Sequence, residues 1–280
     1  MIAIREAVRP NGERMAVEAR EVALVTGAGR GFGAAIAKRL AADGAAVALV
    51  ARSRDQIGEV QAAIEAAGGR ALAIAADVTV PGDVDRAVVE AEAAFGPLTR
   101  FVNNAGVGGP YGPIWEVDMD RWWAAQALHI RAPMLFLRRI LPGMVERNRG
   151  RIIIVSAIAS RMVAAHLSAY CTGKIAQNRI VAEAAAELAE TAVRIFAIDP
   201  GFVFTALASD TMTSPEARKW LPGMVGRLEQ MATNPDRDAD LERCAERCAA
   251  LFSGRYDALS GKYMELPDDL DAMVRAVEAA

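Results

Sequence analysis

The chain has 280 residues, of which 53% are hydrophobic and 24% charged, so it can bury a large core and is not a disordered polymer. Its 32 basic and 35 acidic side chains give a net charge of −3, which offers no basic surface for nucleic acid or an anionic membrane. Three cysteines predict neither a disulfide framework nor a cysteine-rich zinc module. We see no signal peptide and no membrane-spanning run, and we therefore expect a cytoplasmic protein.

Short aliphatic runs of strand length recur along the chain, with helix-period segments between them. After an N-terminal extension over residues 1–20, strands are predicted at 22–27, 47–52, 71–77, 100–106, 151–157 and 193–199. Each run is apolar on both alternating sets of positions, as is typical of strands covered on both faces. Helices are predicted between the strands, for example over 32–43, where Gly44 follows at the usual place for a helix end. The alternation predicts one α/β domain over residues 21–280, with a parallel sheet between two layers of helices.

Two segments interrupt this alternation. Residues 107–118 are rich in glycine and proline, and residues 202–238 carry Met212, Trp220 and Met224 without a strand pattern. We predict that the second segment is a lid loop over a ligand site, because it follows the carboxyl end of a strand. The alternative is a surface insertion that packs its apolar side chains on the body of the domain.

The glycine-rich segment 26–33, with the sequence TGAGRGFG, joins the first of these strands to its helix. Glycine lets a backbone approach a ligand closely, and the amides at a helix N-terminus favour anions. A pyrophosphate can therefore bind there. Glycine clusters also serve in tight turns, so the position between strand and helix carries most of this interpretation.

Further motifs follow in order: Asp77-Val78, Asn103-Asn104-Ala105-Gly106, Tyr170 with Lys174 in a YxxxK spacing, and Pro200-Gly201 with Thr205. With the TGxxxGxG segment, they resemble the short-chain dehydrogenase/reductase family over roughly residues 21–266. The resemblance implies a single-domain Rossmann fold with a doubly wound, seven-stranded parallel sheet and one dinucleotide site. The cofactor-binding residues that it implies, with those weighed below for the cofactor phosphate, are Gly27, Gly29, Arg30, Gly31, Phe32, Gly33, Arg52, Ser53, Asp77, Val78, Asn104, Ala105, Gly106, Tyr170, Lys174, Pro200, Gly201, Val203 and Thr205.

The end of the second strand bears on which dinucleotide is bound. A carboxylate at position 51 would hold the adenosine ribose hydroxyls and repel a 2′-phosphate, but Ala51 stands there. Arg52 follows it, and Arg30 lies in the glycine-rich segment. Two guanidinium groups without a carboxylate suit a 2′-phosphate, so we predict NADP(H) in preference to NAD(H). The alternative is that both arginines are ordinary solvated charges.

Tyr170 and Lys174 lie one helical turn apart and so share a helix face. A free phenol has a pKa of about 10, and a nearby ammonium favours the phenolate. By the resemblance, Tyr170 exchanges a proton with the substrate oxygen, while Lys174 lowers its pKa and holds the nicotinamide ribose.

Two further catalytic positions of the family are changed in this chain. The family's serine lies thirteen residues before the tyrosine, where this chain has Ala157, and Ser156 is predicted to face the other way. The family's asparagine aligns with His129, whose imidazole can also hydrogen-bond water. Ser156 and His129 complete the candidate catalytic set with Tyr170 and Lys174.

Three explanations for Ala157 stay open at this point. The alanine is an introduced substitution, or Ser156 or His166 supplies the hydrogen bond instead, or the chain has left redox chemistry. Our leading hypothesis is NADP(H)-dependent interconversion of a carbonyl and an alcohol on a small, apolar metabolite. The alternative is a nucleotide-binding protein without redox turnover, such as a dehydratase, a cyclase or a regulatory module.

The remaining polar and aromatic features predict no second site. Cys244 and Cys248 lie one helical turn apart but have no further ligand pair nearby, so we expect no metal. The apolar helices that carry Trp122 and Tyr170 are predicted to form a homodimer or homotetramer. The expected partners are thus a small-molecule substrate and further copies of the chain, with no nucleic acid and no membrane.

Overall fold

The computed structural model describes residues 7–8, 14–15, 21–203, 205–234 and 238–279. Most of the predicted extension over residues 1–20 lies outside these ranges. Within it, β1 (Ala7–Val8) and β2 (Arg14–Met15) pair in antiparallel fashion.

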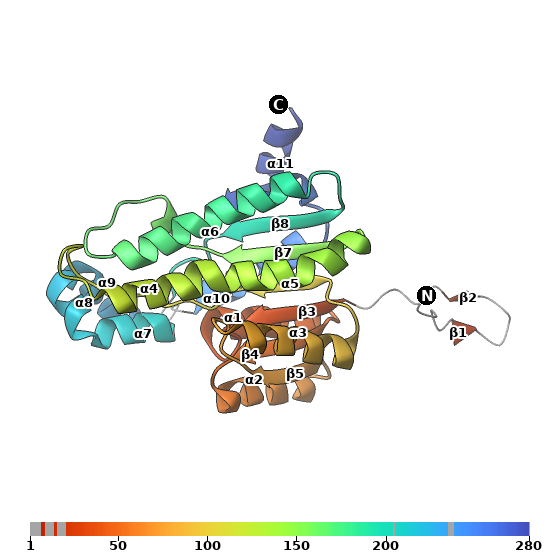
Figure 1. Cartoon of the computed structure of the whole chain (residues 1–280), viewed down its shortest axis with the longest axis horizontal. Coiled ribbons are helices and arrows are strands. Elements are labelled where there is room, and N and C mark those ends of the chain that lie inside the picture. Colours follow the sequence, from red (N-terminus) through yellow and green to blue (C-terminus); the bar gives the residue numbers. More distant parts are fainter. Residues whose placement is uncertain (1–6, 9–13, 16–20, 204, 235–237, 280) are drawn as a thin grey trace.

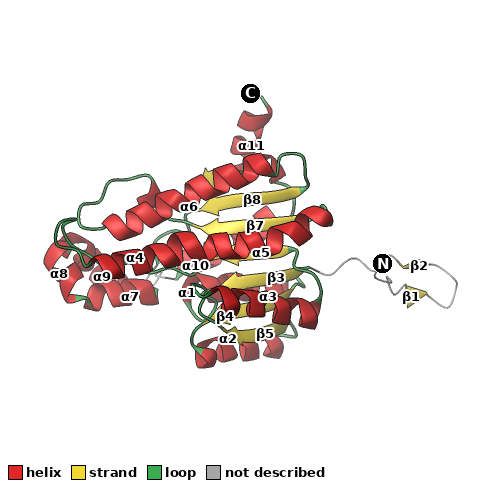
Figure 2. Ribbon diagram, viewed as in Figure 1, coloured by secondary structure: helices red, strands yellow, loops and turns green. Residues whose placement is uncertain are grey.

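The domain is built around one sheet of seven parallel strands, in the order β5-β4-β3-β6-β7-β8-β9 (Figures 1 and 2). The strands are β3 (Val22–Thr26), β4 (Ala46–Ala51), β5 (Arg70–Ala75), β6 (Arg100–Asn103), β7 (Gly150–Val155), β8 (Val193–Ile198) and β9 (Tyr263–Met264). The six strands predicted from aliphatic runs are all present. Ile152, Ile153 and Ile154 in β7 are all fully buried, which requires apolar cover on both faces of the sheet.

Helices cover both faces, as the doubly wound arrangement predicts. One face carries α1 (Gly31–Ala42), α2 (Arg54–Ala66), α10 (Ala239–Phe252) and α11 (Leu270–Glu278). The other carries α3 (Pro81–Phe95), α5 (Ala132–Glu146) and α6 (Ser168–Glu187). Before α5, α4 (Met119–Gln126) and a π-helical turn (Ala127–Arg131) complete one continuous helical stretch. Short 3-10 turns lie at Ile158–Ser160 and Asp257–Leu259.

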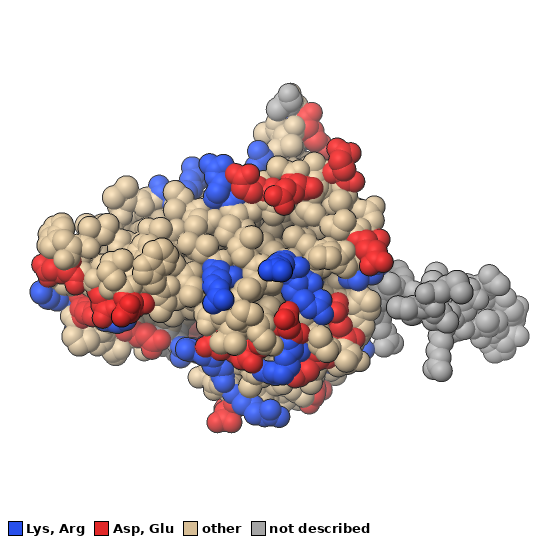
Figure 3. Space-filling model, in the orientation of Figure 1, with Lys and Arg blue, Asp and Glu red and all other residues tan. Residues whose placement is uncertain are grey.

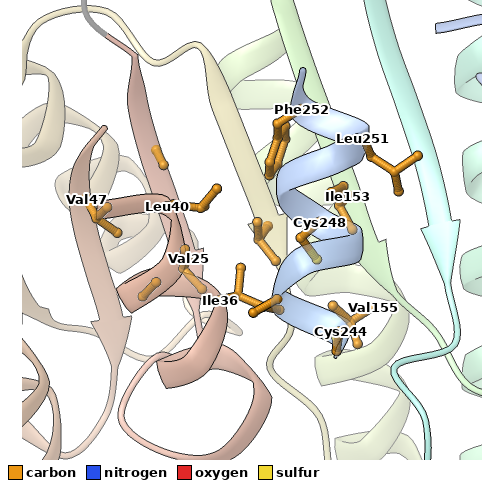
Figure 4. Close-up of a cluster of buried hydrophobic side chains, with 14 of the residues drawn as sticks. Val25, Ile36, Leu40, Val47, Ile153, Val155, Cys244, Cys248, Leu251 and Phe252 are labelled. Atoms are coloured by element: carbon orange, nitrogen blue, oxygen red, sulfur yellow. The ribbon is translucent and has the colours of Figure 1, made fainter. Parts of the chain in front are cut away.

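Cys244 and Cys248 lie in the core. Both are fully buried on the face of α10 that packs against α1 and the sheet, beside Ile36 and Val155 (Figure 4). They therefore act as small apolar side chains. Among the described residues, no group of three or more His, Cys, Asp or Glu side chains is arranged to hold a metal ion. No helix in the same ranges is both long and apolar enough to cross a bilayer.

The segment predicted as a lid loop over 202–238 instead contains three helices. They are α7 (Ala206–Thr213), α8 (Pro215–Trp220) and α9 (Pro222–Ala232). Their N-termini carry ordinary start signals, since Thr205 and Ser214 accept hydrogen bonds from backbone amides and prolines open α8 and α9. These helices lie beyond the carboxyl ends of the strands, on the side to which the arrowheads point in Figure 2.

Candidate functional site

The glycine-rich segment between β3 and α1 has a left-handed backbone, which favours glycine, at two points. Gly27 and Gly31 have φ angles of +63° and +56°, and a Cβ atom at Gly33 would lie 2.3 Å from the Gly27 carbonyl oxygen. At the start of α1, no side chain caps the free amides and the first turn holds no acidic residue. This cradle fits a pyrophosphate, which those amides and the helix dipole would stabilise.

The segment after β6 holds this cradle in place. Asn104 donates its Nδ2 hydrogens to the carbonyl oxygens of Thr26 (3.0 Å) and Gly27 (3.2 Å). In return, the Thr26 hydroxyl accepts the backbone amides of Asn104 (3.0 Å) and Ala105 (3.2 Å). Because β3 and β6 are neighbours where the strand order reverses, the crevice lies where open α/β sheets bind ligands. A Cβ on Gly106 would lie 3.8 Å from Lys174 Nζ, so the segment after β6 reaches from the glycine cradle to Lys174.

The residues predicted to contact the adenosine end lie at the ends of β4 and β5. Arg52 is exposed, and Ser53 caps α2 by accepting the Gln56 amide at 3.4 Å. Asp77 accepts the backbone amide (2.9 Å) and the hydroxyl (2.7 Å) of Thr79, and Val78 is buried. Arg30 is exposed and lies 3.4 Å from Asp210 of α7. The predicted phosphate-binding arginines are thus both open to solvent.

The segment after β8 closes the cradle from the other side. Gly201 has a φ of +89°, Val203 is buried, and Thr205 caps α7. A Cβ on Gly31 would lie 3.2 Å from the Thr205 methyl carbon, so Thr205 lies against the glycine-rich segment. The remaining predicted cofactor residues follow this pattern: Phe32 is half-buried in α1, and Pro200 is buried after β8.

Tyr170 and Lys174 lie together at the start of α6, as their spacing predicts. The Lys174 side chain is buried, and its Nζ donates to the Val155 carbonyl oxygen at 2.8 Å, 5.6 Å from the Tyr170 ring centroid. Burial lowers the pKa of Lys174 to about 7, partly offset by the Asp199 carboxylate. Burial, with the Asp199 charge added, raises the pKa of Tyr170 well above its ordinary value. In the chain by itself desolvation is the largest effect on the Tyr170 pKa. The lowering of that pKa by Lys174 stays a prediction for the complex with the nucleotide.

Ser156 and Ala157 follow each other at the extended end of β7, where the period of a strand predicts that they face different sides. The Ser156 hydroxyl is buried and donates to the Lys174 backbone carbonyl at 3.2 Å. Ala157 stays extended, with φ −168° and ψ 160°, and begins the 3-10 turn. The next amide, of Ile158, donates to Asp199 at 3.0 Å. Ser156 thus ties the strand to α6, while position 157 carries no hydroxyl to offer a substrate.

His129 is fully buried in the π-helical turn, edge-on to Tyr170 with ring centroids 5.7 Å apart. Its Nε2 accepts the Val107 amide at 3.2 Å. Burial and the Lys174 charge lower the pKa of His129 to about 3, so the imidazole is neutral near pH 7. His166, the other histidine, stacks against Trp220 of α8 with centroids 5.0 Å apart.

An apolar cluster covers the Tyr170 side of the site. Tyr111, Leu167, Ala217 and Val225 form its core. Tyr170, Met212, Leu221 and Met224 pack against that core. The Tyr111 hydroxyl lies 2.6 Å from that of Thr211, which joins the loop after β6 to α7. The helices α7–α9 thus fold onto the site rather than standing apart from it.

Two groups close to Tyr170 and Lys174 fall outside the sequence motifs. Asp199 is the last residue before the Pro200-Gly201 motif, and its charge affects the pKa values of Tyr170 and Lys174. Gln177 is fully buried and accepts a hydrogen bond from Lys174 Nζ at 3.2 Å. A polar residue three positions after a helical lysine is a signal that could have located Gln177.

Comparison with known proteins settles the family. A family model described as short chain dehydrogenase matches residues 21–216. The chain belongs to the short-chain dehydrogenase/reductase family. A short chain dehydrogenase of Pseudocercospora fijiensis is 32% identical over 263 residues, covering 92% of this chain and 84% of that protein. A 2-(S)-hydroxypropyl-CoM dehydrogenase of Xanthobacter autotrophicus is 32% identical over 214 residues, covering 74% and 84%.

Solved structures of this family have the same fold. An NAD⁺-bound xylitol dehydrogenase matches with a TM-score of 0.78 at 25% identity, covering 89% of this chain and 98% of that one. An actinorhodin polyketide ketoreductase with NADPH matches with a TM-score of 0.77 at 26% identity, covering 90% and 97%. These relatives place this short-chain dehydrogenase/reductase among enzymes that interconvert carbonyls and alcohols.

Proposed function

We propose that this enzyme reduces a carbonyl group to an alcohol with NADPH, using Tyr170 as the proton donor and Lys174 as its charged support. The observation that carries this proposal is the placement of the pair. Lys174 Nζ donates a hydrogen bond of 2.8 Å to the Val155 carbonyl oxygen at the end of β7. It lies beside the Tyr170 ring and close to Gly106, which follows β6 next to the glycine cradle. Proton donor, ammonium and dinucleotide cradle therefore meet at the carboxyl edge of one sheet.

The residues present fit the cofactor, which would supply a hydride to the carbonyl carbon. The amides of the glycine-rich segment would hold the pyrophosphate, and Lys174 would hold the nicotinamide ribose. Tyr170 then donates its phenolic proton to the carbonyl oxygen, which would otherwise carry the developing negative charge. The buried ammonium of Lys174 stabilises the phenolate that results.

The pKa directions favour reduction and predict how its rate depends on pH. Tyr170 stays protonated across the neutral range, which suits a proton donor. Lys174, with a pKa lowered to about 7, loses its proton as the pH rises through that value. We expect kcat/KM for reduction to be highest below about pH 7 and to fall above it, because neutral lysine no longer stabilises the phenolate. A rate that rises with pH through the same range would contradict this assignment.

NADP(H) is the proposed cofactor because Arg52 and Arg30 are exposed beside the cradle and no carboxylate stands at position 51. Arg52→Ala should weaken NADPH binding roughly tenfold to a hundredfold, the value of a charge-assisted hydrogen bond, and leave NADH binding unchanged. Calorimetric titration measures both. Arg54→Ala is the matched control, since Arg54 is also exposed but lies in the first turn of α2. Tighter binding of NADH than NADPH by the unaltered chain would overturn the assignment.

The proposed substrate is a small, apolar carbonyl compound. The side chains that pack around Tyr170 from α7–α9 are apolar, among them Met212, Leu221 and Met224. Methionine adapts its shape, so these positions can repack around an aliphatic ligand. A kinetic comparison of aliphatic ketones with ketones bearing a charged group tests this, and a preference for the charged series would contradict it.

A second candidate function is nucleotide binding without redox turnover, and Ala157 is the observation that favours it. Position 157 has no donor for a substrate oxygen, and Ser156 is bonded to α6 instead. Nicotinamide absorbance across a panel of ketones and alcohols separates the two functions. Turnover by neither this chain nor its Ala157→Ser variant would favour the second.

We also propose that the protein acts in the cytoplasm as a homodimer or homotetramer, joined through the face formed by α4–α6. Trp123, Met134 and Ile175 on this face are 62%, 48% and 57% exposed. Uncharged side chains dominate there over α4 and the adjoining part of α6 (Figure 3).

Trp123→Glu should convert the assembly to monomers in light scattering, because it places a charge in the proposed interface. Val89→Glu is the control, since Val89 is 54% exposed but lies on α3. A monomeric unaltered chain would contradict the proposal.

A further inference from the structure

Gln177 is a fully buried polar side chain in α6 that the family motifs do not include. It follows Lys174 by three residues, so the two side chains share a helix face. Burying a side-chain amide is unfavourable unless it is hydrogen-bonded, so the partners of the Gln177 amide indicate its role. Both ends of this amide are paired inside the candidate site.

The amide links the catalytic lysine to the helix that carries His129. Gln177 Oε1 accepts a hydrogen bond from Lys174 Nζ at 3.2 Å, and Nε2 donates to the His129 backbone carbonyl at 2.9 Å. The chemistry of the two partners fixes the orientation, because an ammonium only donates and a carbonyl only accepts. Glutamine can satisfy both partners at once.

The His129 carbonyl is available because of the local helix geometry. In a regular helix it would accept the amide of residue 133, but that residue is Pro133, which has no N–H. The backbone adapts to the missing N–H by widening into a π-helical turn over Ala127–Arg131. Gln177 supplies the donor that the proline cannot.

The lysine is thereby held from two sides. Nζ donates to the Val155 carbonyl at the end of β7 and to Gln177. One of its three hydrogens is left for the side of the site where Tyr170 lies, with Nζ 5.6 Å from the ring centroid. Two acceptors on different elements fix an otherwise flexible four-carbon side chain.

We propose that Gln177 is a positioning residue for the Tyr170–Lys174 pair, which fixes Nζ against the His129 backbone and stabilises its charged form. A carboxamide does not titrate near neutral pH, so it does this without taking the charge of the lysine. The other titratable groups around Lys174 are Tyr170 on α6, His129 on the preceding helix and Asp199 at the end of β8. Only the catalytic consequence rests on the proposed function, since the effect on Lys174 can be measured without turnover.

The direct test is the titration of Lys174 by NMR in the full-length protein, with lysine isotopically labelled at Cε. The chain has only four lysines, at positions 38, 174, 219 and 262, and Lys174→Met identifies the signal. Gln177→Leu, which removes the acceptor at similar size, should lower the Lys174 midpoint by about one pKa unit. Gln177→Glu, which places a carboxylate beside Nζ, should raise it by a similar amount.

Val181→Ala is the matched control. Val181 is fully buried in the same helix, one turn further on, so its truncation loosens α6 without touching Lys174. It should lower the melting temperature and leave the midpoint unchanged. Midpoints that stay at the wild-type value in both Gln177 variants would overturn the proposal, and Gln177→Glu gives that answer even where Gln177→Leu does not fold.

Steady-state kinetics then test the catalytic consequence. Gln177→Leu should lower kcat roughly tenfold to a hundredfold with little change in the KM of the ketone, because the ammonium acts on the phenolate formed in the transition state and not on binding of the ketone. Absence of turnover in the unaltered chain would refute the proposed function alone, since the NMR midpoints still decide the role of Gln177. Shifted midpoints with an unchanged kcat would refute the catalytic consequence alone.

Discussion

Tyr170→Phe is expected to lower kcat for carbonyl reduction by roughly a thousandfold, with a much smaller effect on NADPH binding. The change removes only the phenolic oxygen, which is the proposed proton donor, and a positioned acid contributes a factor of this size. Within the described part of the chain the Tyr170 hydroxyl makes no protein hydrogen bond, whereas its ring packs in the apolar cluster under α7–α9. The variant should therefore fold and melt like the parent protein.

Turnover is followed by nicotinamide absorbance, and cofactor binding by the fluorescence of the reduced nicotinamide. Tyr256→Phe is the matched control, because Tyr256 is buried on the opposite face of the sheet, in the core beside α10. It should leave kcat unchanged. Equal activity of Tyr170→Phe and the parent protein would remove Tyr170 from the mechanism.

Ala157→Ser is expected to raise kcat by roughly a hundredfold to a thousandfold, the effect of one recovered donor to a developing oxyanion. The strand end is extended at this position and the preceding side chain, Ser156, faces α6. A hydroxyl at position 157 therefore points to the other side. Because the donor acts on charge that develops in the transition state, KM should change little.

Ser156→Ala is the companion variant, and it should leave kcat nearly unchanged. Its hydroxyl is bonded to the Lys174 backbone carbonyl at 3.2 Å, so its loss affects the joint between β7 and α6. The reverse pattern, with Ser156→Ala inactive and Ala157→Ser neutral, would show that Ser156 is the functional serine. The end of β7 would then be shifted by one residue relative to the family alignment.

Most of the sheet is predictable because parallel strands are buried on both faces and read as continuous aliphatic runs. The ends of the helices are equally predictable where a glycine follows the last turn, as at Gly44, which has a φ of +92°. The seventh strand, Tyr263–Met264, has only two residues and leaves no such pattern. It was expected only from the family resemblance.

The segment after β8 shows a limit of pattern reading. Its three helices have 8, 6 and 11 residues, too short to show a strong helical period. The signals that were present are the caps, namely Thr205 and the Ser214-Pro215 pair. These caps predict helices in this segment, whereas the missing strand pattern alone predicts a loop.

Within the site, the spacing of residues in the sequence predicts which way a side chain faces better than it predicts how the pKa of that side chain shifts. The period of two predicts that Ser156 and Ala157 face different sides of β7. The hydrogen bond from Ser156 to the Lys174 carbonyl places Ser156 on the α6 side. The direction of the Tyr170 pKa depends on how deeply the ring lies under α7–α9, and no motif records that depth. The link from Lys174 through Gln177 to the His129 carbonyl depends on two helices meeting, which a linear sequence does not show.

The most direct measurement is the fate of the hydride when a ketone substrate is reduced with NADPH that carries deuterium at both positions of nicotinamide C4. We expect mass spectrometry to find one deuterium per product molecule, on the carbinol carbon, and we expect Tyr170→Phe to suppress its transfer. The hydroxyl proton should come from solvent by way of Tyr170. Product that forms without deuterium, or NADPH that binds without being consumed by any ketone in the panel, would contradict the proposed reduction.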